Sequence, residues 1–185
     1  MKARFGIIEV PRSIASAVEN AKLAEKSGFD WFGVADSQSL FRELFVTLAM
    51  VGQATERMMI GPSVTNPLTR HPAVMASAAA SVQELSGGRA MLGIGTGDRA
   101  LYNLNERPPG LAGLREYIVT LREMLSGRPT EFAGRGIHTQ WVAEQADNPV
   151  PVYIAAEGPK TLELAGEVAD GVICGMGLSA EVGKL

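Results

Sequence analysis

Glycines cluster where one apolar run of the chain ends, in the segment Gly93-Ile94-Gly95-Thr96-Gly97-Asp98. A strand end without side chains lets a flat ring lie against the backbone, because glycine permits close approach and unusual dihedral angles. The segment is not a dinucleotide fingerprint. The third glycine of G-x-G-x-x-G would fall on Asp98, and the motif follows the fourth predicted strand instead of the first. A tight loop that needs positive φ is the alternative interpretation.

Two later strand-to-helix turns have the composition of a phosphate site. In the first, Ala155-Ala156-Glu157-Gly158-Pro159-Lys160-Thr161, Pro159 marks a helix start and Gly158 leaves space in front of it. Free N–H groups at a helix N-terminus, together with Lys160, favour an anion. The second turn, Cys174-Gly175-Met176-Gly177-Leu178-Ser179, is also rich in glycine. Two such turns on adjacent strands could hold one phosphate, as barrels do near their late strands, or could be ordinary loops.

Polar residues also end the second and third predicted strands. Asp36 could form a hydrogen bond with a cofactor ring or a substrate, or could cap its own loop. Arg70 and His71 could lie over a ligand. The alternative pairs Arg70 with a carboxylate and makes His71 the cap of the helix that Pro72 opens, and for His71 we favour the capping role.

Apolar runs and amphipathic stretches alternate along the chain, which predicts a parallel sheet covered by helices. Strands are predicted over 5–8, 31–35, 58–64, 90–95, 152–155 and 171–174. Helices are predicted over about 13–27, 44–55, 72–85, 114–126 and 160–168, with a sixth opened by Ser179. A doubly wound sheet and a barrel both satisfy this order. The segment of about 130–149 breaks the rhythm and is either a small hairpin or an irregular excursion.

The composition bounds the class of protein. The 185 residues are 46% hydrophobic and suit one globular domain. The net charge is −3 and the basic residues are scattered, which argues against a nucleic-acid surface. No segment reads as a membrane span, and a single cysteine, Cys174, fits a reduced cytoplasmic setting. His71 and His138 have no partners at metal-ligand spacing, so no metal site is predicted.

These segments together resemble the luciferase-like monooxygenase superfamily, and most closely its coenzyme F420-dependent, methylenetetrahydromethanopterin reductase-like branch. The resemblance covers essentially the whole chain. Its most specific part is Leu85-Ser86-Gly87-Gly88-Arg89 followed by the glycine-rich segment 93–98. It implies a (β/α)₈ TIM-barrel fold, incomplete here, with about six βα units present in a single domain over 1–185. It also implies hydride transfer between a cofactor and a small organic substrate.

The resemblance implies roles for particular residues as well. The expected cofactor is coenzyme F420, with FMN as the alternative. Residues near its phosphate would be Gly158, Pro159, Lys160, Gly175, Met176 and Gly177, and residues near its ring would be Ser63, Val64, Thr65, Gly95, Thr96 and Gly97. Glu157 is also expected to bind the cofactor. The branch has a non-prolyl cis peptide that matches the Ser63–Val64 bond. Asp36 matches the branch's acidic residue and is the candidate catalytic residue. Ser37 stands where many members have histidine, which argues against proton transfer by a histidine there.

Six strands cannot close a barrel of the normal geometry, because closure links strand number, tilt and stagger. We therefore expect the chain to pair with itself or with a second polypeptide across the gap, or the natural protein to continue past Leu185. Interior-facing side chains, expected to include Ile7, Val34, Ile60 and Ile173, would otherwise lose partners. In a monomer, the segment 130–148 would have to cover the open edge. A non-catalytic flavin-binding protein and an inactive truncated relative are the alternative functions.

Overall fold

Six parallel strands form one curved array with helices on its outer side. The structure is a computed structural model, which describes residues 4–175. Strands β1 (Gly6–Glu9), β2 (Trp31–Val34) and β3 (Met59–Pro62) pair in that order, and β4 (Leu92–Ile94), β7 (Val152–Ala155) and β8 (Gly171–Ile173) form a second group. Parallel bridges from Ile60 to Ala90 and from Thr65 to Ile94 join β3 to β4. The described strands do not close into a barrel, since β1 and β8 each end a sheet.

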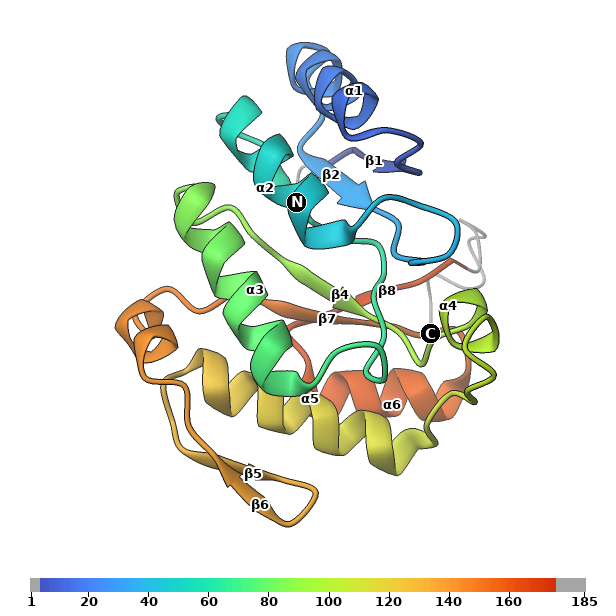
Figure 1. Ribbon diagram of the computed structural model, residues 1–185, viewed down its shortest axis with the longest axis vertical. Coiled ribbons are helices and arrows are strands. Elements are labelled where there is room, and N and C mark those ends of the chain that lie inside the picture. The colour runs from blue at the N-terminus through green and yellow to red at the C-terminus, as the bar shows by residue number, and fades with distance from the viewer. Residues whose placement is uncertain (1–3, 176–185) are drawn as a thin grey trace.

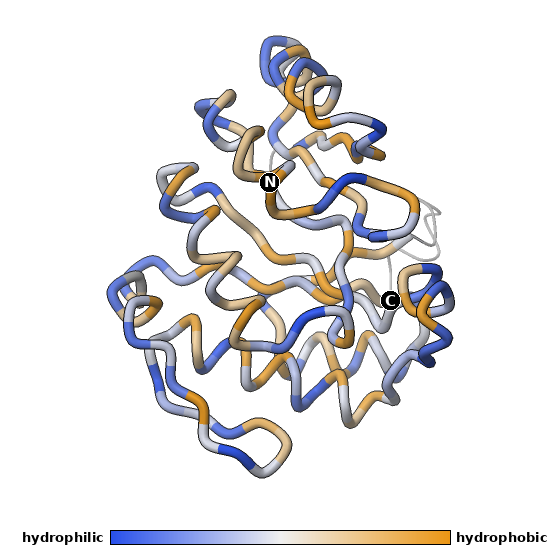
Figure 2. Tube along the Cα trace, in the orientation of Figure 1, coloured by the Kyte–Doolittle hydropathy of each residue, from blue (hydrophilic) through white to orange (hydrophobic). Residues whose placement is uncertain are grey.

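The helices form an arc around the strands, as Figure 1 shows. They are α1 (Ile14–Lys26), α2 (Leu44–Ala54), α3 (Pro72–Leu85), α5 (Leu111–Leu125) and α6 (Pro159–Val168), with a short α4 (Arg99–Tyr102) beyond β4. Their ends follow the expected signals: the Ser13 hydroxyl caps α1, and glycines with positive φ follow α1 and α3. In Figure 2 the central strands are coloured mainly as hydrophobic and many outer turns as hydrophilic.

The main core lies between the strands and the helices, which corrects part of the sequence prediction. Ile60 is fully buried, and its Cδ1 lies 3.0 Å from the position that a Cβ on Gly52 of α2 would take. Val34 is also fully buried in this core, and Ile7 pairs in register with Phe32, on the helix-facing side of the sheet. Of the four residues expected to face the barrel interior, Ile173 does so, with its side chain reaching Gly93. Continuously apolar strands do not reveal which alternate residues face inward.

The inner face of the array combines large rings with glycines. A Cβ on Gly6 would lie 2.2 Å from the Trp31 ring, and one on Gly33 would lie 2.5 Å from it. Across the array, a Cβ on Gly171 would lie 2.3 Å from the Tyr153 ring. The Trp31 ring thus lies over Gly6 of β1 and Gly33 of its own strand, and the Tyr153 ring lies over Gly171 of β8. The rings fill the space that side chains at these positions would take, which explains why glycines occur inside the strands.

Arg89 joins the last turns of α2 and α3 to the start of β3. Its Nε donates to the Ser86 carbonyl at 2.7 Å, and Nη1 donates to the Met58 carbonyl at 2.8 Å. Nη2 donates to the carbonyls of Gly52 and Thr55 at 2.9 and 2.6 Å. A guanidinium presents its donors in a fixed fork, and here they satisfy carbonyls that the helix ends leave unpaired. The run that carries the strongest sequence resemblance thus includes a residue with a structural role.

Replacing Arg89 with methionine is expected to lower the free energy of unfolding by about 2 kcal/mol, because partly buried carbonyls lose their donor. Urea denaturation measures this as a lower midpoint with an unchanged slope. Arg57→Met is a matched control, since the Arg57 side chain donates one hydrogen bond, from Nη2 to the Glu25 carbonyl at 2.8 Å. Equal losses in the two variants would contradict the role given to Arg89.

Glu25, near the end of α1, holds the start of β3 through three backbone N–H groups. Its Oε1 accepts from Glu56, Arg57 and Met58 at 2.7–3.1 Å. Partial burial alone would raise the pKa of Glu25, but these bonds and the charge of Arg57 outweigh it and place the pKa below its ordinary value. The carboxylate form is therefore the one that the folded chain stabilises.

Glu25→Gln is expected to lower the free energy of unfolding by about 1–2 kcal/mol near pH 7, since charge-assisted bonds are replaced by weaker ones. A group whose pKa is lower in the folded state stabilises the fold above its unfolded pKa. The difference between wild type and variant should therefore shrink as the pH falls below 4.5 through the folded pKa. Chemical denaturation from pH 7 to pH 3 tests this, with the exposed Glu19 replaced by glutamine as control. A difference that stays constant with pH would contradict the explanation.

The irregular segment predicted over about 130–149 is a hairpin followed by a 3-10 turn. Strands β5 (Thr130–Phe132) and β6 (Arg135–Ile137) pair antiparallel, and η1 (Trp141–Gln145) follows. The hairpin lies against α5 (Figure 1), where the Thr120 hydroxyl donates to the Glu131 carbonyl at 3.1 Å. It does not pair with β1 or β8 in the described structure, so the covering role that a monomer would require of this segment is not seen there.

Candidate functional site

A cleft with a volume of about 660 Å³ opens at the carboxyl ends of the parallel strands. Its walls are the segments that follow β2, β3, β4, β7 and β8. Many of the residues predicted for the site line this cleft: Asp36, Ser63, Val64, Thr65, Gly95, Thr96, Gly97, Glu157, Gly158 and Gly175. Ligands of barrel proteins bind at this end of the strands, so the location fits the sequence prediction.

Two of the predicted residues that the structure describes do not line the cleft. Pro159 and Lys160 form the first turn of α6 beside it. Met176 and Gly177 lie outside the described residues, as does the helix predicted to begin at Ser179.

Backbone lines the cleft at the ends of β3 and β4. The peptide bond between Ser63 and Val64 is cis, as predicted. Gly95 faces the same wall: a Cβ there would lie 3.2 Å from Cγ2 of Val64 and 3.4 Å from Cβ of Ala155. A side chain at this position would fill space between the strand ends, and glycine leaves that space free. Gly97 has a φ of +94°, so both interpretations of this glycine-rich segment, close approach and a tight turn, describe part of it.

The start of α6 has the features of an anion site. Gly158 is the N-cap residue and supplies no side-chain hydrogen bond to the helix, and a Cβ on it would meet no atom within 4 Å. The first turn is therefore uncapped and open, with the helix dipole directed at the cleft. Glu157, directly before this helix start, carries a negative charge and so does not favour an anion. Its Oε1 lies 2.9 Å from the position that a Cβ on Gly175 would take. The carboxylate thus lies beside Gly175, the first glycine of the second turn predicted to hold a phosphate.

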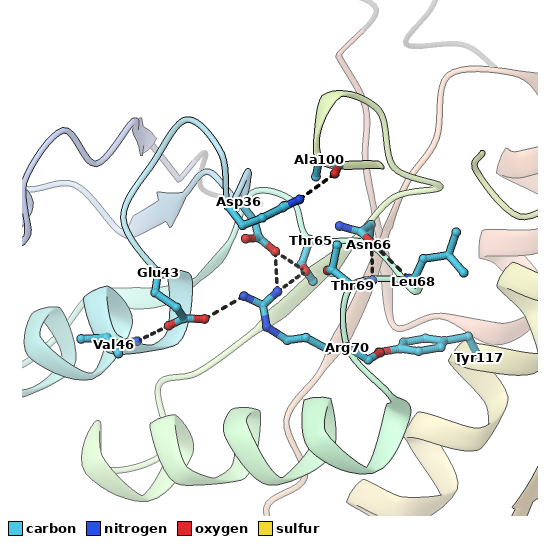
Figure 3. A network of polar contacts seen from close by, with 11 residues as sticks. Asp36, Glu43, Val46, Thr65, Asn66, Leu68, Thr69, Arg70, Ala100 and Tyr117 are labelled. Atoms are coloured by element: carbon cyan, nitrogen blue, oxygen red, sulfur yellow. Dashed lines mark hydrogen bonds and ion pairs between the residues drawn. The ribbon is translucent and has the colours of Figure 1, made fainter. Parts of the chain in front are cut away.

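Asp36 and Arg70 form a buried ion pair at the end of β2, shown in Figure 3. The Oδ2 atom of Asp36 accepts from Nη1 of Arg70 at 2.7 Å and from the Thr65 hydroxyl at 2.6 Å. Nη2 of Arg70 donates to Glu43, the cap of α2, at 2.7 Å. The Tyr117 hydroxyl of α5 donates to the backbone carbonyl of Arg70 at 2.9 Å. One guanidinium therefore connects the ends of β2 and β3 to α2.

The pKa values of Arg70 and Tyr117 are both raised in this network, but for different reasons. Desolvation alone would lower the pKa of Arg70, but the bonds and charges of Asp36 and Glu43 outweigh it and raise the pKa. Burial raises the pKa of the Tyr117 hydroxyl well above its ordinary value, so Tyr117 stays a neutral donor. The network holds a fixed charge arrangement at the cleft wall. Of the two interpretations of Arg70, the structure shows the one in which it pairs with a carboxylate.

His71 caps α3, as favoured from the sequence. Its Nδ1 accepts from the backbone N–H of Ala73 at 3.2 Å, with Pro72 at the first helical position. The ring packs edge-on against Phe132 of the hairpin, with centroids 5.3 Å apart. His71 does not line the cleft, and no group of three or more His, Cys, Asp or Glu within residues 4–175 is placed to hold a metal ion.

A second, smaller cavity of about 360 Å³ lies at the opposite end of the strands. It is lined by the last turns of α5, the segment before β7 and the end of α6, and includes Arg122, Arg128 and Asp170. Arg122 and Asp170 form an ion pair at 2.6 Å across it. None of the residues predicted for the site lines this cavity.

Comparison with known proteins decides the family. The family model for luciferase-like monooxygenases matches residues 3–184. The chain belongs to the luciferase-like monooxygenase family. It is 38% identical over 177 residues to 5,10-methylenetetrahydromethanopterin reductase of Methanolobus tindarius, covering 91% of this chain and 53% of that protein. It is 37% identical over 186 residues to F420-dependent glucose-6-phosphate dehydrogenase of Gordonia bronchialis, covering 89% and 54%.

Solved structures of F420-dependent enzymes match the same region. Coenzyme F420-dependent tetrahydromethanopterin reductase of Methanopyrus kandleri superposes with a TM-score of 0.79 at 29% identity, covering 94% of this chain and 56% of that one. An F420-dependent secondary alcohol dehydrogenase, in complex with an F420–acetone adduct, superposes with a TM-score of 0.81 at 23% identity, covering 94% and 58%. The chain thus has the TIM-barrel type of fold and spans about half the length of the relatives it matches.

Two features of this luciferase-like cleft were missed from the sequence. The short helix α4 forms one side of the cleft and is capped by the Asp98 side chain, which accepts from the Arg99 N–H. Gln38, which follows β2, contacts α4: its Nε2 donates to the Ala100 carbonyl at 2.8 Å. Asp98 directly before an alternating segment is a capping signal, but a four-residue helix is too short to show periodicity. The Gln38 contact joins positions 62 apart, and nothing local marks it.

Proposed function

We propose that the protein is an oxidoreductase that uses coenzyme F420, with FMN as the alternative, and acts on a small organic substrate. One observation carries the proposal: the strand ends predicted to hold the ring and the helix start predicted to hold the phosphate line one cleft. The relatives named for F420 support that cofactor. Bound there, the cofactor would accept or donate hydride, while the protein supplies position and electrostatics.

The residues of the cleft fit such a cofactor in three ways. Gly95, which has no side chain, leaves space at the cleft wall beside Val64 and Ala155 for a planar ring. The uncapped start of α6, with Lys160 in its first turn, fits a phosphate. Glu157 repels a phosphate but can accept hydrogen bonds from hydroxyl groups, so we assign it to the hydroxyl-bearing side chain that links ring and phosphate in both cofactors.

Asp36 is proposed to contact the cofactor ring or the substrate, as inferred from the resemblance. Its carboxylate lines the cleft but is 5% exposed and bound by Arg70 and Thr65. These contacts fix its orientation, so it would act by accepting a hydrogen bond from the ligand. Ser37 follows it, and no histidine lines the cleft among the described residues.

Titration of the apoprotein with F420 and with FMN tests the proposal. We expect saturable binding of F420, followed by its intrinsic fluorescence, with weaker binding of FMN. Turnover of reduced or oxidised cofactor with small alcohols, aldehydes or imines then separates an enzyme from a non-catalytic flavin-binding protein. Failure to bind either cofactor would contradict both candidates and leave an inactive relative.

We propose that further polypeptide, either a second copy or additional strands, covers the two edges of the array. Strand β1 and its flanks expose Phe5, Ile8 and Val10, and β8 exposes Val172. Unpaired strand edges with exposed apolar side chains readily pair with other chains. No helix within residues 4–175 is long and apolar enough to cross a membrane. The cytoplasmic location inferred from the sequence stays a prediction.

For the 185-residue chain alone, light scattering after size-exclusion chromatography should give a mass above the 19.6 kDa of one copy, or the chain should bind a hydrophobic dye strongly. Exposing apolar surface to water costs about 25 cal/mol of free energy per Å². The total free energy of unfolding of a domain is only roughly 5–15 kcal/mol, so large exposed edges are unfavourable. A monomer that unfolds cooperatively and binds no dye would contradict this prediction.

A further inference from the structure

Ser37, at the end of β2, has a buried hydroxyl without a hydrogen-bond partner. The residue is 5% exposed, and no residue within 4–175 donates to or accepts from its Oγ. Its backbone, in contrast, is fixed, because the Ser37 carbonyl accepts the N–H groups of Leu40 and Phe41, both at 2.9 Å. The unmet hydrogen-bonding capacity is therefore confined to the side chain.

The position of Ser37 indicates where a partner would come from. Ser37 lines the cleft between Asp36 and the apolar side chains of Leu40 and Phe41. Its neighbour Asp36 is already bonded to Arg70 and Thr65. Buried polar groups are nearly always paired, and a hydroxyl left unpaired lowers stability. Such departures from satisfied packing are expected where a ligand completes the bonding.

We propose that the Ser37 hydroxyl is a specificity-determining group that forms a hydrogen bond with the small molecule in the cleft. The partner is a carbonyl oxygen, N–H or hydroxyl, contributed either by the cofactor ring or by the substrate. The redox identity of these ligands rests on the proposed function. Serine donates and accepts without titrating near neutral pH, whereas histidine at this position would titrate. The protein side of the contact therefore keeps one protonation state between about pH 6 and pH 9.

Ser37→Ala tests the proposal, with Thr69→Val as the matched control. Thr69 carries a second buried, unpartnered hydroxyl, but it does not line the cleft. Without ligand, both variants should unfold at or above the wild-type temperature, because each removes an unsatisfied buried oxygen. With ligand, Ser37→Ala alone should weaken binding by about tenfold, the effect of one lost hydrogen bond.

Two readouts distinguish the sources of the partner. A tenfold higher Kd for F420 or FMN in Ser37→Ala assigns the partner to the cofactor. If the cofactor Kd is unchanged and kcat/KM is about tenfold below the wild-type value at every pH tested, the partner belongs to the substrate. The proposal is wrong if both constants stay within about twofold of wild type, a change too small for a lost hydrogen bond. It is also wrong if the ligand-free variant unfolds well below wild type, since the hydroxyl would then have a structural partner.

These outcomes separate the proposal from the proposed function. Wild-type protein that binds neither F420 nor FMN contradicts the function, whatever the variant does. The ligand-free melting temperatures then decide the remaining question: a Ser37→Ala variant less stable than wild type shows that the hydroxyl is satisfied without ligand and overturns the inference.

Discussion

Replacing Gly158 with aspartate is expected to weaken F420 binding by about 100- to 1,000-fold, while leaving the chain folded. Aspartate is a preferred N-cap residue, and the φ of −94° at Gly158 suits any side chain. The new carboxylate would accept the N–H groups of the first turn and take them from the phosphate. It would also place a negative charge about 4 Å from the anion, which is unfavourable by about 4 kcal/mol at an effective dielectric constant near 20.

Gly158→Asn is the matched control for this variant. Asparagine caps a helix about as well as aspartate but carries no charge. It should weaken binding less, by about tenfold, since it competes for the N–H groups without repelling the phosphate. Fluorescence titration measures both constants, and circular dichroism confirms the fold. If the folded Gly158→Asp variant binds F420 with unchanged affinity, the phosphate does not bind at the start of α6.

Replacing Arg70 with methionine should lower the free energy of unfolding by about 3–5 kcal/mol, the largest stability effect expected in this chain. The side chains of Arg70 and Asp36 are 15% and 5% exposed, so removal of the cation leaves a buried carboxylate with no opposite charge beside it. Thr65 would remain its hydrogen-bond donor, and Glu43 would be left to solvent. Urea denaturation of the ligand-free protein measures the loss.

A double variant isolates the charge effect. Asp36→Asn together with Arg70→Met removes both charges, so it should be less destabilised than Arg70→Met alone. Arg115→Met is the surface control, because the ion pair between Arg115 and Glu167 is about half exposed and should contribute less than about 1 kcal/mol. A loss below about 1 kcal/mol in Arg70→Met, or a double variant no more stable than it, would show that the buried pair is not essential to the end of β2.

Local signals predicted the helices and strands well because each is carried by residues within the element. Pro72 and His71 fix the start of α3, and the strand predicted over 152–155 matches β7. The same signals could not assign the inner and outer faces of the strands. Val34 and Ile60 were expected in the barrel interior and instead pack under the helices, since strands buried on both faces show no alternation.

The candidate site was predicted from the sequence mainly where its residues follow strand ends. Gly95, Gly158 and Thr65 come from separate strands, and the carboxyl ends of parallel strands necessarily meet at one edge. Contacts between distant positions were not predictable in the same way. The bond from Gln38 to Ala100 and the unmet hydroxyl of Ser37 depend on how loops fold over the cleft, and no periodicity or spacing encodes them.

Hydrogen–deuterium exchange with and without F420 tests most directly whether the cofactor binds at the carboxyl ends of the strands. We predict that protection appears in three segments, 63–66, 95–100 and 157–161, which line the cleft or open α6. Gly158→Asp should lose this protection at the same F420 concentration. Protection confined to the opposite cavity, in segments 122–128 and 167–170, would contradict the location of the site, and an unchanged exchange pattern at saturating F420 would contradict cofactor binding itself.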